Sequence, residues 1–221
     1  GNGWYSLPTR DVFGMHDANW HTPPKVRLNV VVEYESGVRD VIVTDRTWKW
    51  GHGEIVYNSV RSGETIDHTK SVHGWNEPGF CDSLWRNVCH VPAPLGKLTA
   101  DPMPPMRVAK ELKPVGITET GPGVYLVDFG ENLTGWVETR VRGSRGQTVE
   151  LQFNEVLKAD GSLDTQNSTW HTRGRYQTEL LILGGDGEET FEPRFTYHGF
   201  RYMQVRGLAY KPAPEDFTAK C

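Results

Sequence analysis

Cysteine, basic charge, long apolar runs and helical periodicity are all scarce in this sequence of 221 residues. The cysteines are Cys81, Cys89 and Cys221, and an odd number without regular spacing favours free thiols, with a Cys81–Cys89 disulfide as the alternative. No cysteine and histidine spacing fits a zinc site. The net charge of −4 gives no basic footprint, so neither nucleic acid nor an anionic membrane surface is an expected partner.

Apolar runs long enough to cross a bilayer are also missing, since a spanning helix needs about 20 such residues. The first residues, GNGWY, lack the basic region and apolar core of a signal peptide. Removal of a signal would leave the same picture, so periplasmic, secreted and cytoplasmic locations all stay open.

Turn-forming and aromatic residues are plentiful, with 24 glycines, 14 prolines and 8 tryptophans. Short segments rich in β-branched and aromatic residues alternate with glycine-rich separators, which is typical of an all-β sandwich protein with little helix. The predicted strands cover residues 25–34, 38–43, 55–57, 108–118, 123–129, 135–142, 148–156, 176–183, 191–197 and 201–205. Residues 92–105 hold five prolines and are predicted to be a linker between two β-sandwich units.

Three sequence blocks of the second half resemble the bacterial α-L-rhamnosidases of glycoside hydrolase family 78. They are VDFGENLTGW at 127–136, LQFNEVLKADGSL at 151–163 and FEPRFTYHGFRY at 191–202. The resemblance implies that residues 106–208 form the concanavalin-like β-sandwich of that family. Residues 209–221 are then a tail that leads towards a catalytic domain.

The first half is similar to the jelly-roll-like amino-terminal module of the same family. The similarity lies in GNGWY at 1–5, NSVRSGETID at 58–67 and GWN at 74–76. Ile66-Asp67-His68 departs from the family, which has an aromatic residue followed by Asp-Ala-Arg there. GNGWY stands in the middle of that module in the family, so residues 1–91 are expected to be a partial domain.

The resemblance also implies a helical (α/α)6 barrel that carries the catalytic glutamates after the sandwich. Twelve helices of about 11 to 12 residues, with loops of about 4 to 6, need roughly 200 residues. Only 13 residues follow Leu208, so the barrel is not expected in this chain. Within the chain, Glu155 with Asp160 or Asp164 is the least implausible carboxylate pair for inverting hydrolysis. A structural role for these acids is strongly favoured, because Asp160-Gly161 is a common turn element.

Sugar binding is the stronger functional hypothesis for the first half. Carbohydrate sites combine an aromatic platform with side chains that bind hydroxyl groups. Asn58, Glu64 and Asp67 supply such groups, and the platforms are Trp48 and Trp75, with Trp50 as a further candidate. In some family members the module resembles a calcium-dependent L-rhamnose-binding module, which assigns Asn58 and Asp67 as candidate calcium ligands. The alternative is an ordinary loop, with the tryptophans packed in the core.

The blocks of the second half that resemble the family are predicted to be mainly structural. Trp136 is expected to anchor the sandwich core, and Asp128 and Asn132 to bind backbone groups around Gly130. In the segment that contains Arg194 and His198, residues 195 and 197 should face one side and 196 and 198 the other. The exposed side is a candidate surface for the helical catalytic domain.

The favoured function is therefore that of accessory, non-catalytic β-domains of an α-L-rhamnosidase-like glycoside hydrolase that removes terminal α-L-rhamnose. The alternative is an independent calcium-dependent L-rhamnose-binding module. Expected partners are rhamnose-containing carbohydrate and the helical catalytic domain. If residues 1–91 lack partner strands, an open sheet edge favours a homo-oligomer.

Overall fold

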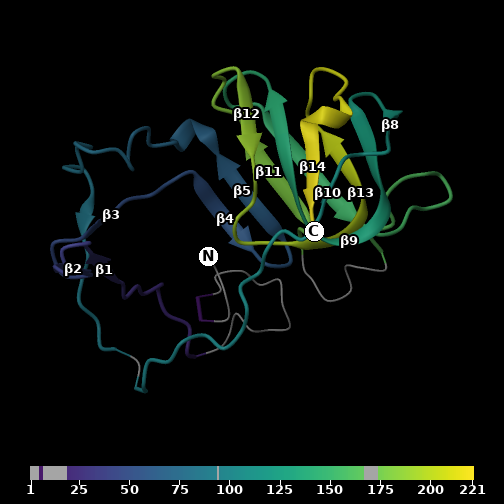
Figure 1. The fold of residues 1–221 in the computed structure, drawn as a ribbon. Helices are drawn as coiled ribbons and strands as arrows, with labels where there is room; N and C mark the ends of the chain where they lie inside the picture. Colours follow the sequence, from purple (N-terminus) through teal and green to yellow (C-terminus); the bar gives the residue numbers. More distant parts are fainter. Residues whose placement is uncertain (1–4, 7–18, 94, 167–173) are drawn as a thin grey trace. The chain divides into compact units, whose positions relative to one another are not determined.

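The computed structural model describes residues 5–6, 19–93, 95–166 and 174–221 (Figure 1). Its ordered elements are strands and two short 3-10 turns, η2 (His68–Lys70) and η3 (Pro214–Asp216). None of the helices within these ranges has the length and apolar character needed to span a membrane. The chain is therefore all-β, as the sequence predicts.

The chain divides into two compact units, each built from separate stretches of sequence. The sandwich unit comprises residues 1–22, 54–71 and 107–221, and the hairpin unit comprises residues 23–53 and 72–106. This division differs from the predicted boundary at residues 92–105, because residues 54–71 join the sandwich. The physical cause is strand pairing: their second strand forms a parallel ladder with a strand more than 100 residues later.

The sandwich unit contains ten strands in its described part. They are β4 (Ile55–Ser59), β5 (Gly63–Asp67), β7 (Glu111–Leu112), β8 (Gly116–Gly121), β9 (Val124–Arg142), β10 (Thr148–Asn154), β11 (Thr178–Ile182), β12 (Glu188–Phe191), β13 (His198–Arg206) and β14 (Phe217–Lys220). Their main order is β4-β5-β11-β10-β13-β9-β14-β7, and β8 and β12 also pair with β9. Only the β5–β11 pair among these is parallel.

The long strand β9 belongs to both layers of the sandwich. Its first half pairs with β8 and β13, and its second half pairs with β12 and β14. Between the halves the register with β13 shifts, and Gly130 takes a φ of 84°, which favours glycine. The sequence predicts two separate strands here, because the turn-like Gly130-Glu131-Asn132 segment is expected to end the first one. In the structure the strand forms a bulge at this point and continues.

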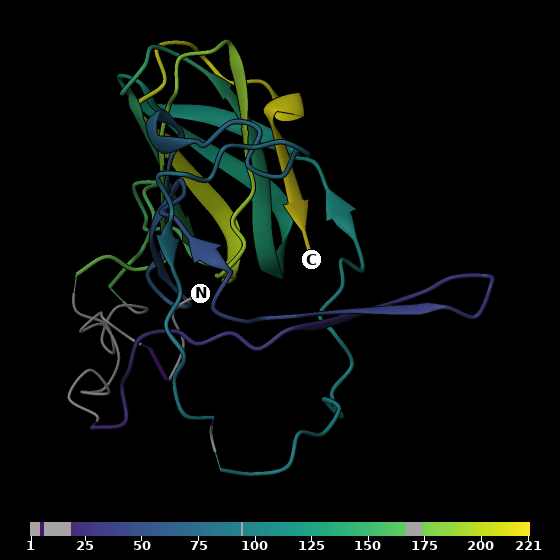
Figure 2. The same ribbon diagram turned by 90° about the vertical axis from the view of Figure 1, so that its left-hand side faces the viewer.

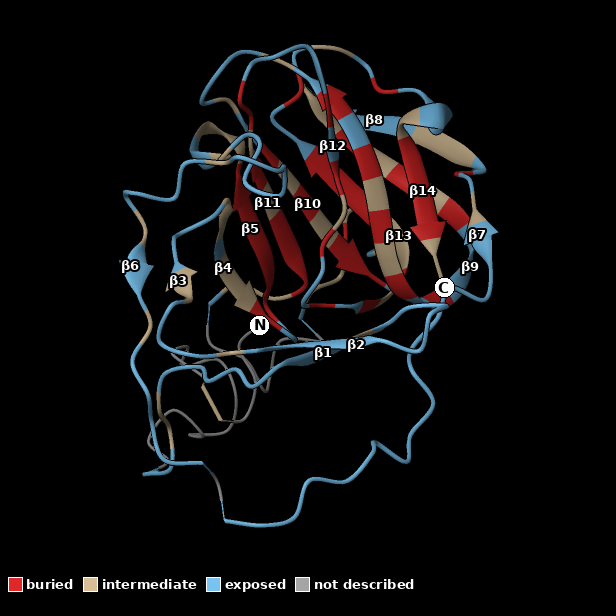
Figure 3. Ribbon diagram, turned by 60° about the vertical axis from the view of Figure 1, so that its left-hand side comes forward, coloured by how far each residue is buried: buried red, intermediate tan, exposed pale blue. Residues whose placement is uncertain are grey.

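The core lies between the layers and is rich in phenylalanine. Alternate residues of β9 face inward, which follows from the two-residue period of a strand. Phe129, Phe153 and Phe200 pack edge to face, with ring centroids 4.9 and 5.6 Å apart. Figure 3 shows this burial as red bands along β5, β9, β10, β11 and β13.

Three predicted segments of the second half differ from the structure. Residues 108–118 form two strands rather than one, because Pro114 lacks the N–H that a ladder needs. Residues 192–197 form the turn between β12 and β13, where the N–H groups of Arg194 and Phe195 are bound by a side chain instead of a strand. The predicted tail at 209–221 includes β14, which pairs with β9 and β7.

The hairpin unit contains two small two-stranded sheets. One is the hairpin of β1 (Asn29–Glu33) and β2 (Arg39–Val43), which Figure 2 shows as a long thin ribbon. The other joins β3 (Lys49–Trp50) to β6 (Arg86–Asn87). The hairpin was expected from the glycine turn at Gly37, whose φ is 81°. The described part of residues 92–105 holds no strand or helix.

Candidate functional site

The predicted ligands Asn58 and Asp67 are not brought together by the structure. Asn58 pairs directly with Glu64 across the β4–β5 ladder. Asp67 lies three residues after Glu64 in β5, so its side chain projects from the face of the sheet opposite to that of Glu64 and Asn58. The two candidate calcium ligands therefore face different directions.

Asp67 is engaged in capping the η2 turn. Its Oδ1 accepts hydrogen bonds from the Thr69 N–H and hydroxyl, at 3.1 and 2.5 Å, and its Oδ2 pairs with Lys70 at 3.1 Å. The Thr69 hydroxyl, together with Lys70, lowers the pKa of Asp67. Across the described residues, no group of three His, Cys, Asp or Glu side chains is arranged to hold a metal ion.

Glu64 is fully buried and faces the interior of the sandwich. Burial, and then the neighbouring carboxylate of Glu179, raise the pKa of Glu64 to about 7. Its two oxygens accept the N–H groups of Arg194 and Phe195, at 3.3 and 3.2 Å. A carboxyl that still holds a proton about half of the time at pH 7 and is closed off from solvent is poorly suited to bind a cation or a sugar hydroxyl.

Glu64 belongs to a buried cluster with Glu179 and His198. Glu179 Oε2 accepts the Glu64 N–H at 2.6 Å, and Glu179 Oε1 lies 2.5 Å from His198 Nε2. The imidazole stacks on Phe153 with ring centroids 4.7 Å apart. Nδ1 of His198 is buried and has no hydrogen-bond partner among the described residues, so we assign the proton to Nε2, which donates to Glu179. The cluster joins β5, β11 and β13 inside the sandwich.

Glu179 was missed by the sequence analysis, although a signal for it exists. In the segment TELLI, Glu179 shares its strand face with Leu181, which is 1% exposed. An acid at a core-facing position needs a buried partner, and His198 is that partner.

The Asp128 block forms a network on the outer face of the sandwich. Asp128 accepts the Gly130 N–H at 2.7 Å and binds the Arg201 guanidinium with both oxygens, at 2.9 and 3.0 Å. The hydrogen bond from Arg201 lowers the pKa of Asp128. Asn132 donates to Glu155 at 3.0 Å, and so binds a side chain rather than the expected backbone group.

Trp136 does not anchor the core, contrary to the prediction. Its neighbours in β9, at positions 135 and 137, face inward, so Trp136 points outward and is half-buried. The indole N–H donates to Glu192 Oε1 at 2.8 Å. The Arg194 side chain is also directed away from the core: it is exposed, and only the backbone N–H of Arg194 contacts Glu64.

Asp160, a member of the carboxylate pair considered for hydrolysis, accepts hydrogen bonds within its own turn. The Ser162 hydroxyl and N–H lower the pKa of Asp160, which keeps this group ionised. Among the described acids Glu64 alone has a pKa that is clearly raised, and it is sealed in the core. Hydrolysis needs a protonated carboxyl that reaches the glycosidic oxygen.

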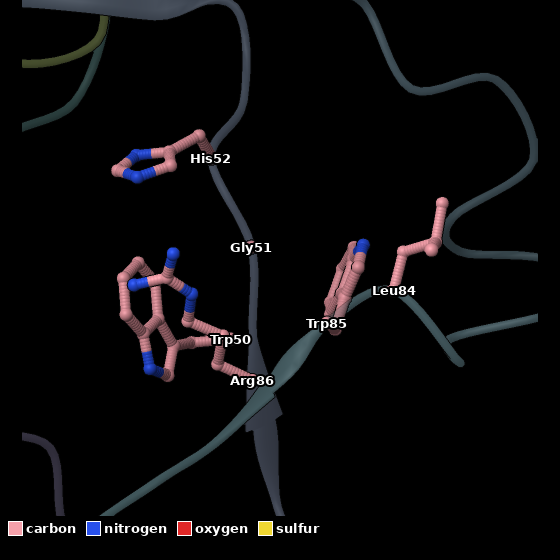
Figure 4. A pocket seen from close by; sticks show the side chains of 6 residues that line it. All are labelled: Trp50, Gly51, His52, Leu84, Trp85 and Arg86. Carbon is pink, nitrogen blue, oxygen red and sulfur yellow. The ribbon is translucent and has the colours of Figure 1, made fainter.

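The tryptophans proposed as platforms lie in the hairpin unit. Trp48 is half-buried and donates its indole N–H to the Val43 carbonyl at 3.1 Å, while Trp75 is 60% exposed. Trp50, the further candidate platform, lines a pocket of about 290 Å³ in this unit, shown in Figure 4. The lining residues are Trp50, Gly51, His52, Leu84, Trp85 and Arg86.

Comparison with known proteins places both halves of the chain in one family. Residues 1–110 match the model of the α-L-rhamnosidase N-terminal domain, and residues 118–221 match that of the bacterial α-L-rhamnosidase concanavalin-like domain. An α-L-rhamnosidase of Streptomyces avermitilis is 38% identical over 219 residues, which is 99% of this chain and 21% of that protein. One of Formosa agariphila is 32% identical over 89% of this chain and 21% of its own length.

Solved structures agree. The Streptomyces avermitilis α-L-rhamnosidase complexed with L-rhamnose superposes with a TM-score of 0.88 over 99% of this chain and 21% of that one. The α-L-rhamnosidase from Dictyoglumus thermophilum gives a TM-score of 0.84 at 38% identity over 90% of this chain and 22% of that one. The chain thus spans about a fifth of the length of these relatives. The chain belongs to the bacterial α-L-rhamnosidase family, and its two halves correspond to the amino-terminal and concanavalin-like β-domains of that family.

Proposed function

We propose that this chain supplies non-catalytic accessory β-domains to a glycoside hydrolase that removes terminal α-L-rhamnose from glycans or glycosides. The main observation behind this proposal is that both halves of the chain match β-domains of rhamnosidases. The matched region makes up about a fifth of the relatives' length. The protonation states of the acids support it, because the carboxyl with a raised pKa is buried.

In this role the sandwich unit serves as a rigid support for a helical catalytic domain. Its exposed turn between β12 and β13 presents Phe195 and Tyr197, which are 41% and 43% exposed, while the intervening Thr196 is buried. Glu64 holds the backbone of this turn from inside. A turn fixed in this way presents its aromatic side chains in a constant position, which suits a docking surface.

Turnover of an aryl α-L-rhamnoside by the 221-residue chain tests the proposal. We expect no release of the aryl group above the buffer rate. Turnover at rates typical of glycosidases, which run at about 1–1000 per second, would contradict the accessory role.

Calorimetric titration with L-rhamnose, in calcium and again in chelator, tests the alternative function as a calcium-dependent sugar-binding module. The opposed directions of Asn58 and Asp67 lead us to expect no calcium-dependent heat from these two residues. Saturable heat that disappears both in chelator and in N58A would show that the alternative is correct.

A further inference from the structure

The pocket of the hairpin unit carries a positive charge that no described carboxylate balances. Arg86 is exposed and forms no ion pair within the described residues, and no acid is among the lining residues. Lys49, which neighbours Trp50 in β3, is neutralised by Asp82 at 2.7 Å. Arg86 is therefore the cation of this surface that remains available to a ligand.

The Arg86 guanidinium lies next to an aromatic ring. Residues 50 and 86 pair across the β3–β6 ladder, and the guanidinium carbon lies 5.7 Å from the centroid of the Trp50 ring. His52 meets the same indole edge to face, with centroids 5.2 Å apart. Figure 4 shows these three side chains together on one side of the strand. Two nitrogen-bearing groups that can donate hydrogen bonds thus adjoin one indole.

The strand behind this group is tightly packed. A Cβ added at Gly51 would lie 2.8 Å from the Trp85 ring, so glycine allows the Trp85 indole to rest directly on the backbone. Phe80 contacts Trp85 edge to face, with centroids 5.4 Å apart. Trp85 and its neighbours therefore limit the movement of the segment that carries Trp50 and His52.

Arg86 and Trp50 together favour one class of ligand over bare anions and neutral sugars. A bare anion would gain from Arg86 but would leave the indole surface of Trp50, which is 39% exposed, uncovered. A neutral sugar would stack on the indole but would leave the guanidinium without an anion. A sugar that carries a carboxylate satisfies both, because guanidinium and carboxylate match as planar, two-pronged partners. The volume of about 290 Å³ accommodates one sugar ring.

We propose that this pocket binds a hexuronate residue, with the carboxylate on Arg86 and the apolar face of the ring against Trp50. His52 stands beside the indole to donate to a carboxylate or hydroxyl oxygen. This binding goes beyond the accessory role and does not depend on any contribution to hydrolysis. The chain would then recognise acidic saccharides through its hairpin unit.

Calorimetry on the 221-residue chain at low salt tests the proposal, with methyl β-D-glucuronide and methyl β-D-glucoside as probes. The glucuronide should bind saturably with a dissociation constant on the order of 1 mM. The neutral glucoside should bind at least about tenfold more weakly, because it lacks a charge-assisted hydrogen bond.

Two substitutions locate the binding. R86Q should weaken the glucuronide roughly tenfold or more while leaving the glucoside unchanged. W50A should weaken both probes, and W50F should restore most of the loss because it keeps an aromatic face. The matched controls are R39Q, whose arginine pairs with Glu33 in the same unit, and Y34A, whose exposed ring lies outside the pocket lining.

NMR spectra of the backbone amides, recorded for each variant and compared with those of the parent chain, establish that the fold is retained. The proposal is overturned by absence of saturable binding, by equal affinity for the two probes, or by R39Q weakening the glucuronide as much as R86Q does. Loss of affinity in R86Q and W50A, with R39Q and Y34A unaffected, supports it.

Discussion

The sandwich unit and the hairpin unit bury their apolar side chains to very different degrees. In the sandwich, whole strands such as β5 are buried and five phenylalanines are almost completely enclosed. In the hairpin, every residue of β2 is exposed, and β1 has a single half-buried position. An isolated two-stranded hairpin is marginally stable in water. The stability of the sandwich is therefore set by its own core, whereas that of the hairpin unit depends on ladders and local contacts.

The largest effect is expected from F200A, which empties the centre of the phenylalanine cluster. The free energy of unfolding of the sandwich should fall by about 3–5 kcal/mol, because a cavity replaces a fully buried ring. Chemical denaturation followed by circular dichroism measures this loss. F195A serves as the control, since its ring is 41% exposed and its removal should cost less than about 1 kcal/mol. Equal losses would show that the cluster is not the core.

The next effect is a pH dependence that arises from Glu64 in the sandwich. The pKa of Glu64 is about 7 in the fold and lies near its ordinary value of 4.5 when unfolded. Between these values the folded state holds a proton that the unfolded state has lost, so stability falls as pH rises from about 4.5 to 7. The loss amounts to at most about 3.5 kcal/mol, since each unit of pKa is worth about 1.4 kcal/mol.

E64Q should remove most of this pH dependence, because glutamine cannot ionise. Denaturation midpoints measured from pH 4.5 to 8 test the expectation. E131Q removes an exposed carboxylate that pairs with Lys110 and should leave the slope unchanged. A slope in E64Q that equals that of the parent chain would assign the effect to other groups.

A smaller effect, confined to the hairpin unit, is expected from G51A. The added Cβ would lie 2.8 Å from the Trp85 indole, so this local structure should lose about 1–3 kcal/mol. Faster amide exchange in β3 and β6, with unchanged exchange in β9, is the expected readout. At Gly53 a Cβ would meet nothing within 4 Å, so G53A should leave exchange unaltered. Identical behaviour of the two variants would contradict the packing role of Trp85.

The smallest effect on stability is expected from V41K in the exposed hairpin. Val41 is 59% exposed, so the unfolding of the sandwich should change by no more than about 0.5 kcal/mol. Self-association should fall, because a lysine on a strand opposes edge-to-edge pairing. Light scattering over a range of concentrations measures it, with V38K, outside both strands, as the control. A monomeric parent chain would contradict the expected homo-oligomer.

The all-β character and the positions of most strands could be predicted from the sequence, because alternation and glycine turns are local signals. β10, β11 and the β1–β2 hairpin all lie within their predicted ranges. The turn at 192–197 could not be predicted, because it depends on Glu64, which is about 130 residues away in sequence. Alternation still placed Thr196 and His198 on one face of that segment and residues 195 and 197 on the other, and the structure buries the first pair.

The candidate site was less predictable. Asn58, Glu64 and Asp67 are close in sequence, but the two-residue period of β5 separates Glu64 from Asp67. Trp50 and Arg86 meet only because two strands of two residues pair, and such short strands give no periodic signal. Buried partners such as Glu179 and His198 are visible only once the sheet order is known.

The parallel pairing of β5 with β11 has a consequence for how this protein can be divided. A gene cut at the proline-rich stretch would deliver residues 106–221 without β5, because β5 precedes that stretch. The truncated product would expose one edge of β11, and Glu179 would lose the backbone N–H that it binds from Glu64. Useful truncation variants therefore begin before Ile55, and a circular permutant that places residues 54–71 after Cys221 is the alternative route to a minimal sandwich.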